Sequence, residues 1–277
     1  MFQTHRITSL DLPELAPYRT LKRPLEHREQ GIFVAEGDKV VHRLLASDLE
    51  VVSVLLPDHR LGEYEPALHA RRETIPVFAV TDRRVLEELI GFEMFQGVLA
   101  VAKTPQPLAL SALLGRTASP RLFVAADSLT NAENIGLLAR NCAAFGAQAL
   151  IVGETCASPF LRRAVRNSMG TIFELPVIES RNLAASLGEL RAHGVRCIAA
   201  HPHTDKRTVS LADFTNDCCI VFGAEGGGIS PSILAECDEA AAIPMANNVD
   251  SLNVTGAAAV FLYEAQRQRR PAPTKLP

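Results

Sequence analysis

The sequence predicts an α/β protein in which a smaller α/β domain precedes a larger domain built on a parallel sheet. The chain has 277 residues, which is long enough for two ordinary domains. Its content of 47% hydrophobic and 21% charged residues is typical of a globular protein with an apolar core. Short apolar runs alternate with segments of helical periodicity along the chain. Such alternation is characteristic of βαβ units, whose strands lie parallel.

A break in this pattern divides the chain. Turn-forming residues are concentrated in Lys103-Thr-Pro-Gln-Pro107 and again in residues 115–120, on either side of a short leucine-rich segment. We expect that segment, residues 108–114, to form a helix within a linker. The domains expected from this division are a first domain at residues 1–103, a linker at 104–120, a second domain at 121–270 and a tail at 271–277.

The expected elements follow from the periodicity of each segment. In the first domain, apolar runs predict strands at residues 32–35, 51–56, 76–80 and 97–102. Helices are expected between them at residues 38–46, 63–72 and 82–90. In the second domain, the expected strands are residues 122–126, 149–152, 171–175, 196–200, 219–222 and 240–243. The helices expected there are residues 135–145, 159–168, 182–193 and 254–269. Six strands at this spacing predict a parallel sheet with helices on both faces.

Composition argues against several classes of protein. No apolar run approaches the roughly 20 residues of a membrane helix, and the first 15 residues lack the apolar core of a signal peptide, so we expect a cytoplasmic protein. The six cysteines form no CxxC pair, and His201 and His203 have no third ligand nearby, so no metal site is predicted.

The net charge of −3 does not indicate nucleic-acid binding by overall charge. Any such contact must come from local basic clusters, although ordinary solvated charge is the favoured explanation of any single cluster. The candidate clusters are Lys22 and Arg23 with Arg28, Arg162 and Arg163 with Arg166, and Lys206 with Arg207.

The segment from Asn131 to Arg140 follows an expected strand and opens an expected helix. Asn134 is a candidate for the residue that caps this helix. Gly136 and Arg140 are four residues apart and share one helix face, where the guanidinium could bind a phosphate or stabilise an alkoxide. A capped helix with a solvent-exposed arginine explains the same residues.

Two further segments place polar groups at strand ends. Gly223-Ala-Glu225-Gly-Gly-Gly228 follows a buried strand, and its glycines allow the backbone to approach a ligand closely. Its spacing matches neither a Walker loop nor a dinucleotide-binding fingerprint, which argues against a dehydrogenase. Ser251 and Asn253 bring a hydroxyl and an amide to a strand-to-helix junction, where backbone donors are open to a ligand. A turn residue and a helix cap are the alternative explanation.

In this order and near the C-terminus, the three segments resemble the signature motifs of the SpoU family of RNA ribose 2′-O-methyltransferases, part of the SPOUT superfamily. The resemblance covers residues 121–267 closely. It is looser over residues 20–103, where residues 31–37 and 95–100 resemble a small substrate-binding domain similar to ribosomal RNA-binding proteins. It implies a C-terminal trefoil knot, a homodimer, S-adenosylmethionine as cofactor, and ribosomal or transfer RNA as substrate.

The resemblance also implies roles for individual residues. The implied active site consists of Asn134, Arg140, Glu225, Ser251 and Asn253. The implied cofactor-binding residues are Gly223, Ala224, Ile243, Met245, Leu252 and Asn253. Arg166 lies in an R-x-S-x-G stretch that implies a surface facing RNA, and we group it with the candidate RNA-binding residues Lys22, Arg23 and Arg28. Residues 128–133 replace a short Asp-Pro turn found in many relatives, which could alter the approach of RNA.

The implied reaction sets a role for Arg140. Guanidinium groups stay protonated at neutral pH, so we expect Arg140 to stabilise a developing alkoxide rather than to remove a proton. Two related alternatives stay open at this point. One is an RNA-binding SPOUT protein with a degenerate site, and the other is a SPOUT enzyme that methylates a base.

Overall fold

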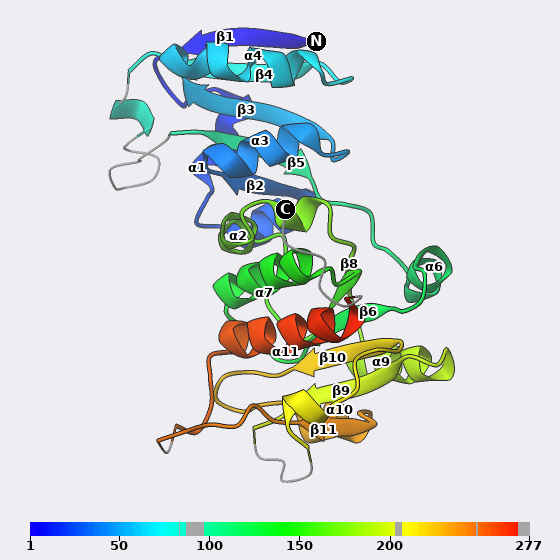
Figure 1. Cartoon of the computed structure of the whole chain (residues 1–277). Coiled ribbons are helices and arrows are strands. Elements are labelled where there is room, and N and C mark those ends of the chain that lie inside the picture. The colour runs from blue at the N-terminus through cyan, green and yellow to red at the C-terminus, as the bar shows by residue number, and fades with distance from the viewer. Residues whose placement is uncertain (83, 87–96, 203–206, 248, 271–277) are drawn as a thin grey trace. The chain divides into compact units, whose positions relative to one another are not determined.

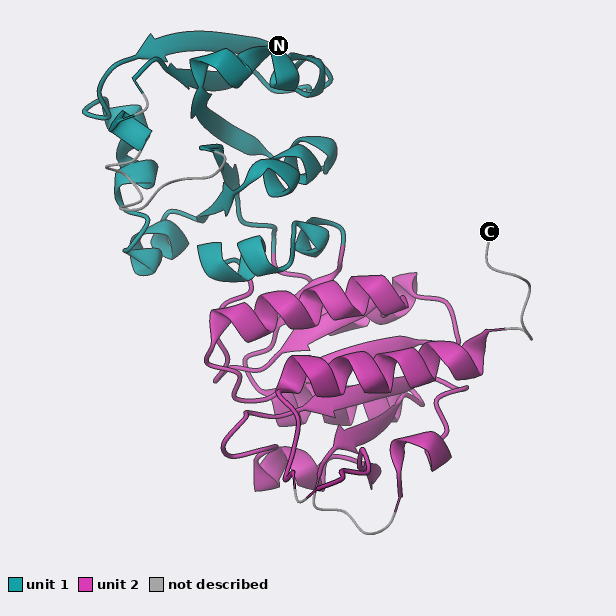
Figure 2. Ribbon diagram, turned by 60° about the vertical axis from the view of Figure 1, so that its left-hand side comes forward, with its two compact units in different colours: residues 1–106, 160–174 teal, residues 107–159, 175–277 magenta. Residues whose placement is uncertain are grey.

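The computed structural model describes residues 1–82, 84–86, 97–202, 207–247 and 249–270 (Figure 1). The chain forms two compact units (Figure 2). The first consists of Met1–Gln106 and Phe160–Glu174, and the second of Pro107–Pro159 and Leu175–Pro277. The sequence analysis placed residues 160–174 in the second domain, whereas they pack in the first unit. The helix expected at residues 82–90 lies largely outside the described residues.

The first unit contains a mixed five-stranded sheet with the order β1-β4-β3-β5-β2. β4 pairs in parallel with β1 and β3, and β5 pairs antiparallel with β3 and β2. β1 was not expected, because four of its six residues are exposed and polar and form no apolar run. The strands are β1 (Phe2–Ile7), β2 (Ile32–Glu36), β3 (Val51–Pro57), β4 (Ile75–Val80) and β5 (Leu99–Lys103).

Short helices surround this sheet. The longest described ones in the unit are α3 (Asp38–Ala46), as expected from the sequence, and α4 (Leu61–His69). The remaining described helices are η1 (Pro13–Leu15), α1 (Ala16–Arg19), α2 (Pro24–Glu29), η2 (Asp58–Arg60), α8 (Arg162–Asn167) and η3 (Thr171–Phe173).

Residues 160–174 are held in the first unit by a buried carboxylate and by ring packing. Glu36, at the end of β2, has a side chain only 8% exposed, and it accepts hydrogen bonds from Arg162 and from Arg166, the latter at 2.8 Å. The ring of Phe33 on β2 lies 5.5 Å from that of Phe160 and 5.7 Å from that of Phe173. These contacts attach the segment to the edge strand of the sheet.

The strand expected at residues 171–175 is absent. Met169 and Gly170 both have positive φ angles, 54° and 80°, and this turn leads into the short helix η3. The Arg43 guanidinium donates a hydrogen bond of 2.8 Å to the Met169 carbonyl oxygen and so supports the turn. β8 (Val177–Glu179) follows as the next strand of the second unit instead.

The second unit contains a fully parallel six-stranded sheet with the order β11-β9-β10-β6-β7-β8, which confirms the expected sheet type. Nearly every residue of its central strands is buried, as expected when helices cover both faces. The remaining strands are β6 (Leu122–Ala126), β7 (Ala149–Val152), β9 (Arg196–Ala200), β10 (Cys218–Phe222) and β11 (Glu239–Ala241).

Helices lie on both faces of this sheet. α7 (Ala132–Phe145) and α11 (Val254–Arg269) lie side by side on one face, where the Phe261 ring meets that of Phe222 at 5.8 Å (Figure 1). α6 (Leu110–Arg116), α9 (Leu183–Ala192) and α10 (Pro231–Ala235) contribute to the apolar core that contains Cys197 and Val221. α6 is the expected linker helix, and it packs into the second unit. Within the described residues, no helix combines the length and apolar character needed to span a membrane.

Candidate active site

A pocket of about 190 Å³ lies at the carboxyl ends of β11, β9 and β10, which are neighbours in the parallel sheet. This edge is where open α/β sheets place their ligands. The glycine loop after β10 forms one wall, and the chain leaving β11 forms another together with the start of α11. The predicted site residues that line this pocket are Ala224, Glu225, Ile243, Met245, Ser251 and Leu252.

Gly223 does not line the pocket but shapes its loop. The backbone of Ala224 pairs with that of Gly228 through two hydrogen bonds of 2.9 Å, which folds the loop back on itself. A Cβ atom at position 223 would lie 2.1 Å from the carbonyl carbon of Gly228. Only glycine fits this close approach. Gly223 therefore acts through loop geometry, whereas the sequence analysis expected direct cofactor contact.

We expect the Gly223→Ala variant to bind S-adenosylmethionine, the cofactor implied by the resemblance, at least about tenfold more weakly than wild type, because overpacking of this kind costs about 1–3 kcal/mol. Isothermal titration calorimetry measures the loss. Gly227→Ala serves as a control for folding, because a Cβ there meets no protein atom within 4 Å. Its unfolding temperature should match that of wild type. Cofactor affinity of Gly223→Ala equal to wild type would contradict the assignment of Gly223 to loop closure.

A carboxylate joins the three sequence motifs beside the pocket. Oε1 of Glu225 accepts a hydrogen bond of 2.8 Å from Nδ2 of Asn134 and another from Nδ2 of Asn253. Both amide side chains thus share one acceptor on the glycine loop. The three residues come from α7, from the loop after β10 and from the start of α11, so their meeting depends on the parallel sheet.

The two asparagines differ in their local roles. Asn253 also caps α11, since its Oδ1 accepts a hydrogen bond of 2.8 Å from the backbone N–H of Thr255. The helix-cap explanation of Asn253 is therefore confirmed, and the same side chain also contacts Glu225. The expected capping role of Asn134 is wrong, because Asn131 caps α7 through the N–H of Glu133. Asn134 instead lies 7% exposed in the first turn, with its side chain turned to Glu225.

Arg140 lies apart from this hydrogen-bonded group. Its side chain is exposed on α7, and Gly136, one turn earlier, is buried. Arg140 is not among the residues that line the pocket, and no described residue pairs with its guanidinium. The structure thus brings Asn134, Glu225 and Asn253 together but leaves Arg140 accessible to a ligand outside the pocket.

The pocket includes residues that the sequence analysis did not assign to a site. His201 and Pro202, directly after β9, line it, as do Phe222 and Phe261. The sequence could have indicated His201, because it follows directly on an expected strand of the parallel sheet, and ligands bind at the carboxyl ends of such strands. His203 lies outside the described residues, and within the described part no three potential metal ligands lie close together.

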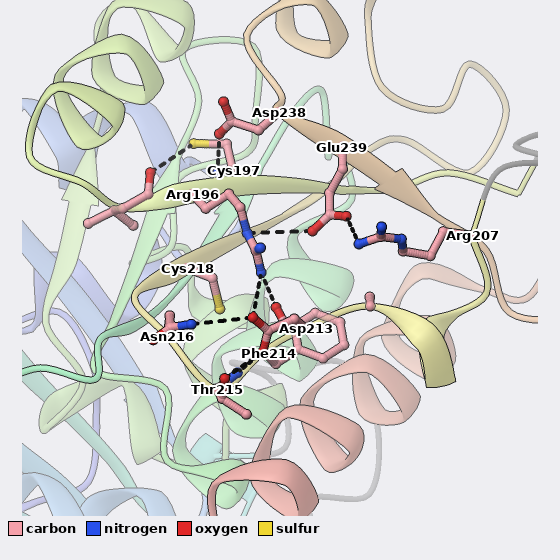
Figure 3. A network of polar contacts seen from close by, with 12 residues as sticks. Arg196, Cys197, Arg207, Asp213, Phe214, Thr215, Asn216, Cys218, Asp238 and Glu239 are labelled. Carbon is pink, nitrogen blue, oxygen red and sulfur yellow. Dashed lines mark hydrogen bonds and ion pairs between the residues drawn. The ribbon is translucent and has the colours of Figure 1, made fainter.

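A network of charged side chains links the first residues of β9 and β11 (Figure 3). Oε1 of Glu239 on β11 lies 3.5 Å from Nε of Arg196 on β9, and Oε2 of Glu239 lies 2.6 Å from Nη1 of Arg207. The Arg207 carbonyl oxygen accepts a hydrogen bond from the N–H of pocket-lining Ala242. Arg207 is therefore engaged within the unit, and its expected partner in a basic cluster, Lys206, lies outside the described residues.

The buried thiols in and beside this network are structural. All six cysteines are free, and burial raises the pKa of Cys197 to about 12. Such thiols are poor nucleophiles and metal ligands at neutral pH. The four buried cysteines, Cys142, Cys197, Cys218 and Cys219, pack as small apolar residues.

The four residues grouped as candidate RNA-binding residues, Lys22, Arg23, Arg28 and Arg166, all belong to the first unit. Lys22 and Arg28 are exposed, and Arg23 forms an ion pair of 3.1 Å with Glu26. Arg166 is 63% exposed while its guanidinium donates to Glu36, so it has a structural role that the sequence did not indicate.

The parallel sheet, with a pocket at the carboxyl ends of its strands, places the protein among the α/β proteins that bind a ligand at this position. A family model described as the SpoU rRNA methylase family matches residues 121–263. The chain belongs to the SpoU rRNA methylase family, which confirms the resemblance drawn from the motifs and makes the protein an RNA methyltransferase.

Relatives cover most of the chain. An uncharacterized tRNA/rRNA methyltransferase of Mycobacterium tuberculosis is 32% identical over 93% of this chain and 90% of its own length. The 23S rRNA (guanosine-2′-O-)-methyltransferase RlmB of Acinetobacter baylyi is 34% identical over 68% of this chain and 77% of its own. The SpoU methyltransferase AviRb from Streptomyces viridochromogenes, solved in complex with the cofactor AdoMet, is 28% identical with a TM-score of 0.79, covering 91% of this chain and 96% of its own.

Proposed function

We propose that the protein transfers the methyl group of S-adenosylmethionine to a ribose 2′-hydroxyl of ribosomal or transfer RNA. The observation that carries this proposal is the hydrogen-bonded group of Asn134, Glu225 and Asn253, which joins the three motifs beside the pocket. The relative RlmB, a 23S rRNA (guanosine-2′-O-)-methyltransferase, and the AdoMet complex of AviRb support it.

The pocket suits S-adenosylmethionine in its chemistry. Ile243, Met245 and Leu252 provide apolar surface for an adenine ring, and the backbone of Gly226 and Gly227 provides polar groups beside it. The bound cofactor supplies a methyl group already activated by its sulfonium, so the protein has to bind, align and stabilise. Glu225 holds the amides of Asn134 and Asn253 in fixed orientations, and alignment of this kind can contribute several kcal/mol.

Arg140 is assigned to electrostatic stabilisation of the 2′-oxygen as it loses its proton. Its exposed guanidinium, which no described residue pairs with, remains available to a phosphate or alkoxide of bound RNA. We expect Arg140→Ala to lower methyl transfer by about a hundredfold or more. Its affinity for S-adenosylmethionine should stay nearly unchanged, because Arg140 is not among the residues that line the pocket. Transfer to RNA and calorimetric cofactor binding measure the two effects, and equal loss of both would contradict this role.

The first unit is assigned to RNA binding. Its exposed Lys22 and Arg28, with Arg23 and Arg166, offer positive charge on a chain whose net charge is −3. Contacts of this type weaken as salt concentration rises, because bound counterions are released from RNA. A filter-binding series with a Lys22→Glu, Arg28→Glu variant should show a shallower salt dependence than wild type, and an unchanged slope would count against the assignment.

We further assign two structural properties to this chain. A homodimer is supported by exposed apolar residues on α11, Val260 at 37% and Tyr263 at 56% exposure. Light scattering should give twice the mass of the 30.0 kDa chain, and a monomeric mass would refute it.

A C-terminal trefoil knot is supported by anchors that draw α11 across the second unit. Arg269, in its last turn, donates hydrogen bonds of 2.7 to 2.8 Å to the carbonyl oxygens of Phe214, Arg121 and Asn216. A crystal structure tests this assignment. A chain path that would straighten completely when its two ends are pulled apart would exclude the knot.

A further inference from the structure

Asp127 is a buried carboxylate next to the site, and neither the motifs nor the pocket lining includes it. It directly follows β6, and the residue is 4% exposed. A buried carboxylate is costly unless hydrogen bonds satisfy it. The identity of its partners therefore shows what the residue holds in place.

Two of these partners are the two ends of the glycine loop. The loop leaves β10 at Phe222, whose carbonyl oxygen accepts a hydrogen bond of 2.8 Å from the Asp127 N–H. It returns at Ser230, whose N–H donates a hydrogen bond of 2.7 Å to Oδ2 of Asp127. One residue thus fixes both the exit and the return of the loop that carries Glu225.

The other carboxylate oxygen binds the segment that leads to α7. Oδ1 of Asp127 accepts a hydrogen bond of 3.0 Å from the Ser128 hydroxyl. Ser128 has a φ angle of 58°, a left-handed conformation that a serine adopts only when its surroundings hold it there. Its hydroxyl also lies 3.0 Å from that of Thr155. The chain continues from Ser128 to Asn134. Asp127 therefore links the segment that carries Asn134 to the glycine loop that carries Glu225.

We infer that Asp127 is a positioning residue that sets the glycine loop against the start of α7 and so fixes the geometry in which Glu225 meets Asn134. It acts through Ser230 and Ser128, because Asp127 is not among the residues that line the pocket. The inference rests on the proposed binding of S-adenosylmethionine to this pocket. Loss of the carboxylate leaves the Ser230 N–H without an acceptor and releases the return of the loop.

Calorimetric titration of S-adenosylmethionine into three variants and wild type tests the inference. Asp127→Ala should bind the cofactor at least about tenfold more weakly than wild type, because the glycine loop loses the hydrogen bond that fixes its return at Ser230. Asp127→Asn should stay within about threefold, because its carbonyl oxygen can accept from Ser230 while its amide donates to the Ser128 hydroxyl. Rescue by asparagine separates hydrogen bonding from charge.

Asp217→Ala is the matched control. Asp217 is a half-buried carboxylate in the same unit that also holds a loop, accepting hydrogen bonds of 2.8 Å from the Arg121 N–H and from its guanidinium. It does not line the pocket. We expect this variant to unfold at a lower temperature than wild type while its cofactor affinity remains unchanged. The control thus shows what a purely structural loss looks like.

The outcomes are distinct. Cofactor binding by Asp127→Ala as tight as that of Asp217→Ala would overturn the inference alone, whereas absence of binding by wild type would overturn the proposed function and this inference with it. If Asp127→Ala does not fold, amide hydrogen exchange in the wild type replaces it. The Ser230 N–H should then exchange much more slowly than that of exposed Gly227, and equal rates would overturn the inference.

Discussion

Replacing Glu225 with alanine is expected to lower the turnover of methyl transfer by about a hundredfold or more, because small displacements of reacting groups have effects of that size. Oε1 of Glu225 is the shared acceptor for Nδ2 of Asn134 and of Asn253. Without it, both amides lose the partner that sets their orientation. The cap of α11 should survive, because Oδ1 of Asn253 still accepts a hydrogen bond from the Thr255 N–H.

Turnover at saturating S-adenosylmethionine and RNA measures this effect, and the unfolding temperature shows whether the fold is retained. Glu225→Gln is the matched variant, since its carbonyl oxygen can still accept from the two amides. We expect its turnover to lie between those of wild type and Glu225→Ala. Wild-type turnover in Glu225→Ala would show that the hydrogen-bonded group has no part in the reaction.

Replacing Glu36 with alanine is expected to destabilise the first unit by about 3 kcal/mol, because breaking a buried ion pair leaves an uncompensated charge. Glu36 accepts from Arg162 and Arg166, and the Arg162 side chain is only 24% exposed. The same change releases the anchor of residues 160–174, so protease cleavage within that segment should accelerate. Chemical denaturation followed by near-ultraviolet circular dichroism measures the loss, since Tyr18 and Tyr64, both fully buried, report on this unit.

Glu26→Ala provides the control for Glu36→Ala. Glu26 pairs with Arg23 at 3.1 Å on the surface, where their side chains are 40% and 70% exposed. Exposed pairs contribute little, so we expect a change below about 0.5 kcal/mol. A Glu36→Ala variant as stable as Glu26→Ala would mean that residues 160–174 are held mainly by the packing of Phe33 against Phe160 and Phe173.

Apolar patterning was sufficient to locate most strands of both sheets. β6 and β9 match their expected limits, because strands buried on both faces form uninterrupted apolar runs. β1 was not predicted, because an edge strand with exposed polar residues has no such run. The prediction of a strand at residues 171–175 was wrong because an apolar run there does not form a strand. Its apolar side chains include Phe173, which packs against Phe33, while the left-handed Gly170 directs the backbone into a helical turn.

The sequence singles out candidate site residues only where their chemistry is encoded in a local motif. Glu225 and Asn253 stand in recognisable motifs, and the structure joins them by a hydrogen bond. His201 and Asp127 gain their significance from partners far along the chain. Asp127 and its partner Ser230 are separated by 103 positions, and only the order of strands β10 and β6 brings them together. The pairing of Arg166 with Glu36, 130 positions apart, was beyond sequence reasoning for the same reason.

Mass-spectrometric nucleoside analysis tests the central claim most directly. Purified protein is incubated with ribosomal or transfer RNA and S-adenosylmethionine carrying an isotopic label in its methyl group, and the RNA is digested to nucleosides. We expect the label on the ribose of a 2′-O-methylnucleoside, with a loss of about a hundredfold in a parallel reaction with Arg140→Ala. A label on a base, or binding of the cofactor and RNA without any transfer, would contradict the assignment as a ribose methyltransferase.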